Sequence, residues 1–569
     1  MCGITGIVNL SKAISIEELE RFTDALKHRG PNGRGIWNDD PRFGLGHRRL
    51  SILDLSDNGA CPFDYTSPSG RRFILTYNGE IYNFIELRLE LERKGYYFKT
   101  GTDTEVLAAS IAEWGTDALD RFNGMWAFAI LDEQSKTLLL SRDRFGVKPL
   151  YYAIQNNTLY FASELKAFTY LTSFSRELNA DLVPHYLNNS QAIEGATEAT
   201  LYKDVFKLLP GHNLTLRPDG SMKKERWWDT TQHIQDKSAL PFPERIAQFR
   251  ELFIDATRIR MRSDVPISCS FSGGIDSTAV ASCIKLLQRQ GLKTERSFEG
   301  QISGFLSAFP DDPLDETEFA REAAAGIELN LIETQSNAAY TTEGILKNIW
   351  TMEDVYPGIA IPVEENYRSI RNAGITVSID GHGSDELLGG YSFYLPAPIG
   401  QLNAMLFDQF HRSLLPAILK NYDRCSMANG IEVRMPFMDY RVVTQAFSCP
   451  SSDKIGNGFT KLLLREAMKG VMPESIRTRR NKIGFNAPMP ALFNGDLIPL
   501  IGLATGSHFW QANPWWDAKE SSEILKRRCG NQTWSANDWG QLLQYWTQIN
   551  LTLWHMIFVE DRFPHLGRR

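Results

Sequence analysis

The stretch VPISCSFSGGIDS, residues 265–277, gives the clearest indication of the fold. Residues 265–271 alternate apolar with small or polar side chains, as a β-strand does, and a glycine-rich turn follows. The apolar residues that come next have the spacing of one helix face, which ends at Gly291: Ile275, Ala279, Val280, Cys283, Ile284 and Leu287. A strand, a glycine-rich turn and a helix N-terminus direct unpaired N–H groups at one point, so this stretch predicts an anion site.

The surrounding patterns predict two domains with different sheets. After residue 240, helical segments such as 246–262 alternate with short apolar strands such as 375–379, which predicts a parallel sheet covered by helices. Before residue 217, short strands predominate: 125–131 and 137–141 flank a polar turn, and two more flank Asn156-Asn157. We therefore expect a two-domain α/β protein, with domains at residues 1–216 and 240–569. Residues 217–244 show neither period and many helix and strand breakers, and are interpreted as the linker.

Composition favours small-molecule chemistry. The chain has 569 residues, 23% of them charged, and a net charge of −7, with no basic stretch that would bind nucleic acid. No apolar run is long enough to span a membrane and no signal sequence opens the chain, so the expected location is the cytoplasm. Seven scattered cysteines are expected to be mostly buried free thiols. Seven tryptophans between residues 510 and 554 are interpreted as core residues.

Cys2 is exceptional because of its position. Removal of Met1 would make it the N-terminal residue. A thiol is a poor nucleophile until it is deprotonated, and a free α-amine, with a pKa of about 7.7–8.0, is a suitable base within the same residue. The sequence therefore makes Cys2 a candidate nucleophile.

The motifs that follow Cys2 strengthen this interpretation. They are Cys2-Gly-Ile-Thr-Gly-Ile7, His28-Arg-Gly-Pro31, Arg49-Leu-Ser-Ile52, Asn78-Gly-Glu-Ile-Tyr-Asn83, Gly101-Thr-Asp-Thr-Glu105, Arg142-Asp-Arg-Phe-Gly146 and Ser163-Glu-Leu-Lys166. Together they resemble the class II, N-terminal-nucleophile (Ntn) glutamine amidotransferases over about the first 210 residues. The resemblance implies an Ntn-hydrolase four-layer αββα sandwich.

The resemblance also implies a role for each motif residue. Cys2 would attack the side-chain amide of glutamine, while the Asn78 side chain and the Gly79 backbone N–H stabilise the oxyanion. Arg49 would bind the α-carboxylate of glutamine with its planar fork. Glu80 and Asp103 would hold its α-ammonium group, and Asn78 would also contact the substrate.

The 272–277 turn resembles the pyrophosphate loop of the ATP pyrophosphatases. It lacks the Gly-Lys-Ser/Thr ending of a Walker A motif, and the enzymes it resembles cut ATP to AMP and pyrophosphate. The residues implied in ATP or pyrophosphate binding are Ser272, Gly273, Gly274, Asp276, Ser277, Asp380, Gly381 and Lys461. Asp276 and Asp385 would hold Mg²⁺, Lys461 would neutralise the leaving pyrophosphate, and Lys482 is a second candidate for that task.

Three further segments resemble the asparagine synthetase domain, so the resemblance covers nearly the whole chain. They are 383–391, 423–439, and 461–466 together with 479–485. Within the second, Glu432, Arg434 and Asp439 are interpreted as a buried structural ion-pair network. The implied reaction uses glutamine, ATP and Mg²⁺ to convert a carboxylate into an amide through an acyl-AMP, with aspartate as the leading acceptor and a homodimer left open as the assembly.

One position departs from that family. Where its members carry Ser-Gly-Glu-Gly, this chain has Asp380-Gly381-His382-Gly383. His382 could replace the glutamate as a catalytic base, since a neutral imidazole accepts the ammonia proton, or it could indicate a different acceptor such as a sugar uronic acid or a secondary metabolite. A structural histidine without a chemical role is the third reading. A non-catalytic glutamine or nucleotide sensor remains a rival, which the presence of Cys2, Arg49 and Asp276 argues against.

Overall fold

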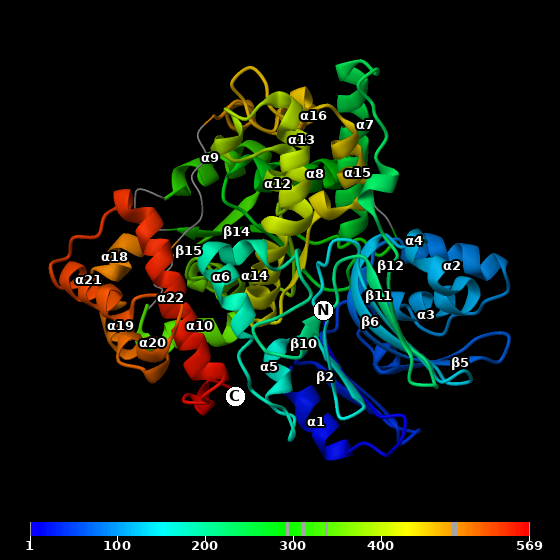
Figure 1. Cartoon of the computed structure of the whole chain (residues 1–569). Helices are drawn as coiled ribbons and strands as arrows, with labels where there is room; N and C mark the ends of the chain where they lie inside the picture. Colours follow the sequence, from blue (N-terminus) through cyan, green and yellow to red (C-terminus); the bar gives the residue numbers. More distant parts are fainter. Residues whose placement is uncertain (1, 292–294, 309–314, 336–339, 481–486, 568–569) are drawn as a thin grey trace.

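A computed structural model describes residues 2–291, 295–308, 315–335, 340–480 and 487–567. Figure 1 shows the N-terminal half, coloured blue to cyan, beside a C-terminal half in which helices surround a central sheet. Among the residues described, no helix combines the length and apolar character needed to cross a membrane.

The N-terminal half contains two six-stranded antiparallel sheets. The first has the order β10-β8-β9-β1-β3-β2 and the second β12-β11-β7-β6-β5-β4. The strands of the first are β1 (Gly3–Val8), β2 (Gly33–Trp37), β3 (Phe43–Arg49), β8 (Tyr151–Gln155), β9 (Thr158–Ala162) and β10 (Val205–Lys207). Those of the second are β4 (Phe63–Thr66), β5 (Arg72–Ile81), β6 (Gly124–Asp132), β7 (Thr137–Arg142), β11 (His212–Leu216) and β12 (Met222–Arg226).

The two sheets pack face to face and helices cover their outer faces. One buried apolar cluster contains Ile4 from the first sheet together with Ile74 and Ala127 from the second. On the outside, α1 (Ile16–Asp24) packs on β1 and β3, while α3 (Asp103–Trp114) packs on β5. This arrangement of layers confirms the predicted αββα sandwich.

Local patterns in the sequence located several of these strands. The strands predicted at 125–131 and 137–141 are β6 and β7, and those around Asn156-Asn157 are β8 and β9. Asn156 and Asn157 have φ values of 51° and 58°. Asparagine tolerates this left-handed conformation, which a two-residue hairpin turn requires.

The predicted linker is not entirely irregular. Residues 222–226 form β12, which pairs with β11 at the edge of the second sheet. All five side chains are exposed, and neither face of this strand is buried. Because periodicity reports one-sided burial, a strand that is exposed on both sides gives no alternating pattern.

A five-stranded parallel sheet organises the C-terminal half, in the order β15-β14-β13-β16-β17. Its strands are β13 (Ile267–Ser270), β14 (Ser303–Ala308), β15 (Asn330–Gln335), β16 (Val377–Ile379) and β17 (Glu432–Arg434). Its helices include α7 (Phe242–Arg260), α8 (Ile275–Arg289), α9 (Thr317–Ile327), α11 (Ile361–Asn372) and α14 (Leu415–Met427). The strands predicted at 265–271 and 375–379 and the helices predicted at 246–262 and after residue 275 are confirmed.

The tryptophan-rich end of the chain is a core, as predicted. Trp510, Trp534, Trp546 and Trp554 are buried in one apolar cluster, and the other three tryptophans pack partly buried against it. Six of the seven cysteines are buried free thiols, and Cys2 is the exception, with intermediate exposure.

Candidate active sites

Cys2 lies directly before β1, opposite the end of β5. Its backbone nitrogen donates a hydrogen bond to Asn78 Oδ1 over 3.0 Å. The Asn78 side chain is fully buried, and its Nδ2 forms no hydrogen bond with the described residues. A buried amide N–H₂ without a partner is available for a ligand, and Asn78 presents it beside the candidate nucleophile.

Two buried carboxyl groups lie near each other in the same half. Asp103, at the start of α3, accepts hydrogen bonds from Tyr77 Oη (2.8 Å) and the Ile81 backbone N–H (2.9 Å). Burial raises its pKa to about 6. Burial also raises the pKa of Glu80 well above its ordinary value, and the charge of Asp103 adds to this. A bound ammonium group would relieve both effects, because a positive charge nearby favours the ionised carboxylates.

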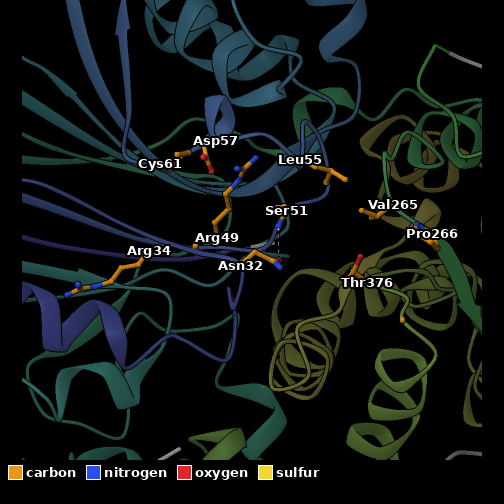
Figure 2. Close-up of a pocket in the computed structure, with 13 residues that line it drawn as sticks. Asn32, Arg34, Arg49, Ser51, Leu55, Asp57, Cys61, Val265, Pro266 and Thr376 are labelled. Carbon is orange, nitrogen blue, oxygen red and sulfur yellow. Dashed lines mark hydrogen bonds between the residues drawn. The ribbon is translucent and has the colours of Figure 1, made fainter.

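Arg49 ends β3 and lines a cavity of about 500 Å³. Its Nη1 donates to the Ser56 carbonyl (2.7 Å) and its Nη2 to the Asp54 carbonyl (2.5 Å), so the loop after β3 fixes the direction of the guanidinium. Figure 2 shows Arg49 among N-terminal residues on one side of the cavity, with Val265 and Thr376 of the C-terminal half on the other. The cavity therefore lies between the two halves.

The residues of the C-terminal half that line this cavity lie just before two central strands. Val265 and Pro266 precede β13, and Gly374 and Thr376 precede β16. The opposite, carboxyl ends of these strands carry the 272–277 turn and the 380–383 turn, and ligands of open α/β sheets bind at carboxyl ends. The same two strands thus join the cavity beside Arg49 to the candidate anion site.

The 272–277 turn has the backbone geometry of an anion site. Gly273 has a φ of +71°, and a Cβ there would lie 2.5 Å from Ala320 Cα, so both conformation and space require glycine. Gly274 caps α8, and its N–H donates to Ser272 Oγ over 3.3 Å. Ser272 Oγ also lies 3.3 Å from Ser277 Oγ, which closes the turn over the helix N-terminus.

Two carboxylates and one lysine meet in front of this turn. Lys461 Nζ lies 2.5 Å from Asp276 Oδ2 and 2.6 Å from Asp385 Oδ1, and the lysine is 1% exposed. Burial lowers the pKa of Lys461, but Asp276 and Asp385 outweigh it and hold the pKa above its ordinary value. The lysine therefore remains charged between two anionic groups. Lys482, the other predicted cation, lies outside the described residues.

This set of groups fits a magnesium nucleotide. The described residues contain no group of three or more His, Cys, Asp or Glu side chains that could hold a metal by itself. Magnesium in nucleotide sites needs no such group, because one or two carboxylates and the phosphate oxygens share its coordination with water. Asp276 and Asp385 supply two carboxylates beside a helix N-terminus, which matches this pattern.

His382 is partly buried in a polar cluster. Its Nε2 lies 3.4 Å from Asp380 Oδ2, and its ring stacks on Tyr422 with centroids 3.5 Å apart. Asp380 also accepts from Tyr367 Oη (2.8 Å) and from the Ser270 backbone N–H (3.0 Å). Burial would raise the pKa of Asp380, but His382 and Ser378 lower it below the ordinary value. Asp380 is thus ionised, and its oxygens accept hydrogen bonds from other residues of the chain.

The 380–383 turn lies directly against the 272–277 turn. A Cβ on Gly381 would lie 2.8 Å from the backbone carbon of Asp276, and Ser384 Oγ donates to Asp276 Oδ1 over 2.7 Å. The predicted residues of the C-terminal half are therefore brought together in one region.

A buried ionic network joins the two halves next to Cys2. Arg29 is fully buried; its Nε donates to the Cys2 carbonyl (3.0 Å), and its Nη1 to Glu164 (2.7 Å) and Asp423 (2.8 Å). Arg424 Nη1 lies 2.9 Å from the same oxygen of Asp423. Asp423 belongs to the C-terminal half, so the carbonyl of the candidate nucleophile is tied through Arg29 to the opposite half.

Removing the Asp423 charge should destabilise the protein strongly. Asp423→Asn leaves Arg29 and Arg424 buried with one compensating charge fewer, so we expect about 3–5 kcal/mol less free energy of unfolding in urea. Burial raises the pKa of Asp423, but Arg29 and Lys148 lower it below its ordinary value. The stabilisation by ionised Asp423 is therefore present above the pKa of this carboxyl in the unfolded chain and is lost as the pH falls through its pKa in the folded protein. The difference in free energy of unfolding between the wild type and Asp423→Asn should then shrink below about pH 4.

Glu177→Gln is the control, because Glu177 pairs with Lys203 on the exposed surface. Exposed pairs contribute about 0–1 kcal/mol, so this variant should unfold like the wild type. Equal stabilities for the Asp423 and Glu177 variants would contradict a structural role for the network.

Glu432, Arg434 and Asp439 form the structural ion pairs that the sequence predicts. All three are fully buried, with Arg434 Nε 2.6 Å from Glu432 and Arg260 Nη1 2.9 Å from Asp439. Arg434 Nη2 also lies 3.4 Å from Glu80 Oε2. The network therefore reaches across to the carboxyl groups beside Asn78.

Sequence reasoning missed several residues at these sites. His47, two positions before Arg49, has a buried Nδ1 without a hydrogen-bond partner among the described residues. Arg29 sits inside a quoted motif, but its partner Asp423 lies 394 residues away. The signal for His47 was the alternation of β3, which places every second side chain on the same face as Arg49.

Two parts of the chain match two different protein families. Residues 1–228 match the family described as "Glutamine amidotransferase domain", and residues 248–412 and 398–556 match "Asparagine synthase". "Asparagine synthetase [glutamine-hydrolyzing] 1" of Bacillus subtilis is 28% identical, covering 99% of this chain and 98% of its own.

Of two further relatives, one is also named an asparagine synthetase and the other is named an amidase. "Asparagine synthetase B [glutamine-hydrolyzing]" of Escherichia coli is 29% identical, covering 85% of this chain and 81% of its own. "Amidase chry2" of Gibberella zeae is 30% identical, covering 88% of this chain and 79% of its own. Because one half of the chain matches each of the two families, and in this order, the chain belongs to the glutamine-hydrolysing asparagine synthetase family.

Proposed function

We propose that the chain hydrolyses glutamine at Cys2 and uses the ammonia to amidate a carboxylate that ATP has activated by AMP transfer, with aspartate as the leading acceptor. The observation that carries this proposal is the pairing of Cys2 with the unpartnered Nδ2 of Asn78. A module that only binds glutamine needs no nucleophile opposite a free amide donor.

In the glutaminase half, Arg49 binds the α-carboxylate of glutamine, and Glu80 and Asp103 bind its α-ammonium. Cys2 Sγ attacks the side-chain carbonyl carbon and the carbonyl oxygen becomes an oxyanion. Asn78 Nδ2 and the Gly79 N–H stabilise that charge, and one such donor is worth about 3–4 kcal/mol in a transition state. The free Nδ2 supports this assignment, because it needs no rearrangement before it can donate.

In the synthetase half, the 272–277 turn holds the phosphates of ATP, with Ser272, Gly273, Gly274 and Ser277 contributing the turn. Asp276 and Asp385 would hold Mg²⁺, which would supply positive charge beside the departing pyrophosphate. Lys461 stays protonated between these carboxylates and supplies a further positive charge to the departing pyrophosphate. Asp380 and Gly381 complete the wall of the site.

Direct evidence for the reaction would be AMP and pyrophosphate release that depends on one carboxylic acid. The purified protein is incubated with ATP, Mg²⁺ and glutamine and a panel of acids that includes aspartate, uronic acids and larger aromatic acids. AMP formation with aspartate and its conversion to asparagine supports the leading acceptor. Glutamine binding without AMP formation for any acid would favour the sensor reading.

A second acceptor class has one specific observation in its favour. His382, which follows β16, contacts Asp380 and Tyr367, and its ring stacks on Tyr422 of α14. Where a glutamate would place a negative charge, this ring is neutral or positive, so it tolerates an acceptor that carries extra negative charge or a larger polar group. A uronic acid or a secondary metabolite would fit this description.

Replacement of His382 should change the choice of acceptor. His382→Glu puts a second carboxylate beside Asp380, so we expect the ratio of kcat/KM for aspartate to kcat/KM for the best other acid to move by about tenfold or more, since one pocket contact is worth about 1–3 kcal/mol. The measurement is the ammonia-dependent rate with each acid. His382→Gln is the matched control, because it keeps a polar side chain but removes the base. If both variants keep the wild-type rates and preference, His382 is structural.

A further inference from the structure

The segment between Glu386 and Asp408 carries no charged side chain, and part of it is exposed. Phe393, Leu395 and Ile399 are 53%, 45% and 50% exposed, and we call these three side chains the apolar patch. No other stretch of this length in the described chain exposes more than one large apolar side chain. Exposed apolar side chains that cluster in this way mark a binding surface.

The segment that carries the patch is anchored in the core. It joins α12 (Ser384–Leu388) to α13 (Ile399–Asp408), two helices that pack against each other in the C-terminal half (Figure 1). Tyr394 and Leu402 are buried in the apolar core, and Tyr394 Oη donates a hydrogen bond to Gln409. The exposed side chains therefore project from a well-packed part of the fold.

The patch is continuous with the charged cluster of the synthetase half. A Cβ on Gly390 would lie 1.9 Å from Asp385 Oδ1 and 2.2 Å from Lys461 Cε, so the backbone passes directly against both groups. Three residues of extended chain span at most about 11 Å, which places the backbone of Phe393 within this distance of Gly390. A ligand bound at the cluster could therefore extend onto the patch.

Aromatic side chains connect the cluster with the patch. Tyr391 Oη donates to Glu386 Oε1 over 2.5 Å, and the Tyr391 ring stacks on Phe393 with centroids 5.2 Å apart. Burial raises the pKa of Tyr394, and the charges of Glu386 and Asp385 add to this effect. The aromatic rings beside the patch are thus close enough to the carboxylates to feel their charge.

We propose that the synthetase half also activates carboxylic acids with a long, uncharged apolar body, which packs on Phe393, Leu395 and Ile399 while the carboxylate lies near the phosphate turn. This inference rests on the proposed transfer of AMP to a carboxylate and names a class of acceptor for it. The absence of charge argues for this class. A charged body would lose water at the patch and find no partner between Glu386 and Asp408.

The reaction is the one proposed above, with a different acceptor. A carboxylate oxygen bonds to the α-phosphorus of ATP, the bond from this phosphorus to the bridging oxygen breaks, and pyrophosphate leaves with the electron pair. Ammonia then forms a C–N bond with the acyl carbon, and the bond from this carbon to AMP breaks. One proton is released as the amide forms.

The test compares two acids that differ only in length. Octanoic acid represents the class, and propanoic acid has the same carboxylate on a chain too short to cover the patch. AMP and pyrophosphate are measured with ATP, Mg²⁺ and ammonium chloride. We expect kcat/KM to be about tenfold or more higher for octanoic acid, because each additional buried CH₂ group favours binding.

Phe393→Ser should reduce this preference. The ratio of kcat/KM for octanoic acid to kcat/KM for propanoic acid should fall by about fivefold or more, mainly through a higher KM for octanoic acid, since the ring that the chain would cover is gone. Ile498→Ser is the matched control, because Ile498 at the start of α19 (Ile498–Thr505) is 43% exposed and lies outside the patch. It should keep the wild-type ratio. Thermal unfolding checks that each variant is folded, and Leu395→Ser replaces Phe393→Ser if the latter fails to fold.

Three results would overturn the inference and leave the proposed function intact. They are AMP formation with aspartate but not with octanoic acid, equal use of octanoic and propanoic acids, and a wild-type ratio in folded Phe393→Ser. If this variant keeps the ratio but changes the oligomeric state in sedimentation, the patch is a contact between two copies of the chain. Failure of the proposed function itself would appear differently, as no AMP formation with any acid, aspartate included.

Discussion

Cys2→Ala is expected to abolish glutamine-dependent amide formation and to leave the ammonia-dependent reaction intact. The variant lacks the thiol that forms the acyl-enzyme, so glutamine hydrolysis should fall by at least about a thousandfold, the scale on which loss of a nucleophile acts. The phosphate turn and the Asp276–Lys461–Asp385 cluster lie in the other half and keep their contacts. Both activities are measured on the same preparation, with glutamine or ammonium chloride as the nitrogen source.

The N-terminus provides an independent check of this assignment. In a chain that keeps Met1, the Cys2 nitrogen is part of a peptide bond and cannot act as an amine. Intact-mass measurement of active protein should therefore show a chain that begins at Cys2. Cys61→Ala is the matched control, since Cys61 lines the cavity beside Arg49 but burial raises its thiol pKa, and it should retain glutamine hydrolysis. Glutaminase activity in Cys2→Ala would exclude Cys2 as the nucleophile.

Features encoded by neighbouring residues were predictable from the sequence. The alternation of β13, the glycine turn and the apolar face of α8 occupy one short stretch, and the structure has them as expected. The same is true of the hairpin at Asn156-Asn157, where two residues determine the turn. Local stereochemistry and one-sided burial fix such elements, and both leave a period in the sequence.

Features that depend on distant partners were not predictable. Residues 222–226 form a strand only because β11 offers an open edge, and their exposed side chains show no period. The contact of Arg29 with Asp423 requires the two halves to be docked. The free nitrogen of His47 is apparent only when the register of β1 with β3 and the facing carbonyl of Tyr77 are known.

The second large effect is expected in the other half. Asp276→Asn should reduce AMP formation by about 100-fold or more, because stabilisation by the metal is worth several kcal/mol and each 1.4 kcal/mol changes the rate about tenfold. The substitution keeps the size of the side chain, and the amide oxygen can still accept from Ser384 Oγ, which now lies 2.7 Å away. A loss of AMP formation would therefore be due to the missing negative charge of Asp276. The measurement is pyrophosphate release with saturating ATP and acceptor.

Asp255→Asn is the control for removal of a charge from the same half, because Asp255 on α7 pairs with Arg258 and Arg441 away from the phosphate turn. It should leave AMP formation unchanged. Lys461→Ala should lose less activity than Asp276→Asn, since the N–H groups at the start of α8 remain to hold the phosphates. Glutamine hydrolysis should survive in all three variants, because Cys2 and Asn78 are in the other half. Unchanged AMP formation in Asp276→Asn would mean that the carboxylate only holds Lys461, and the magnesium assignment would then be wrong.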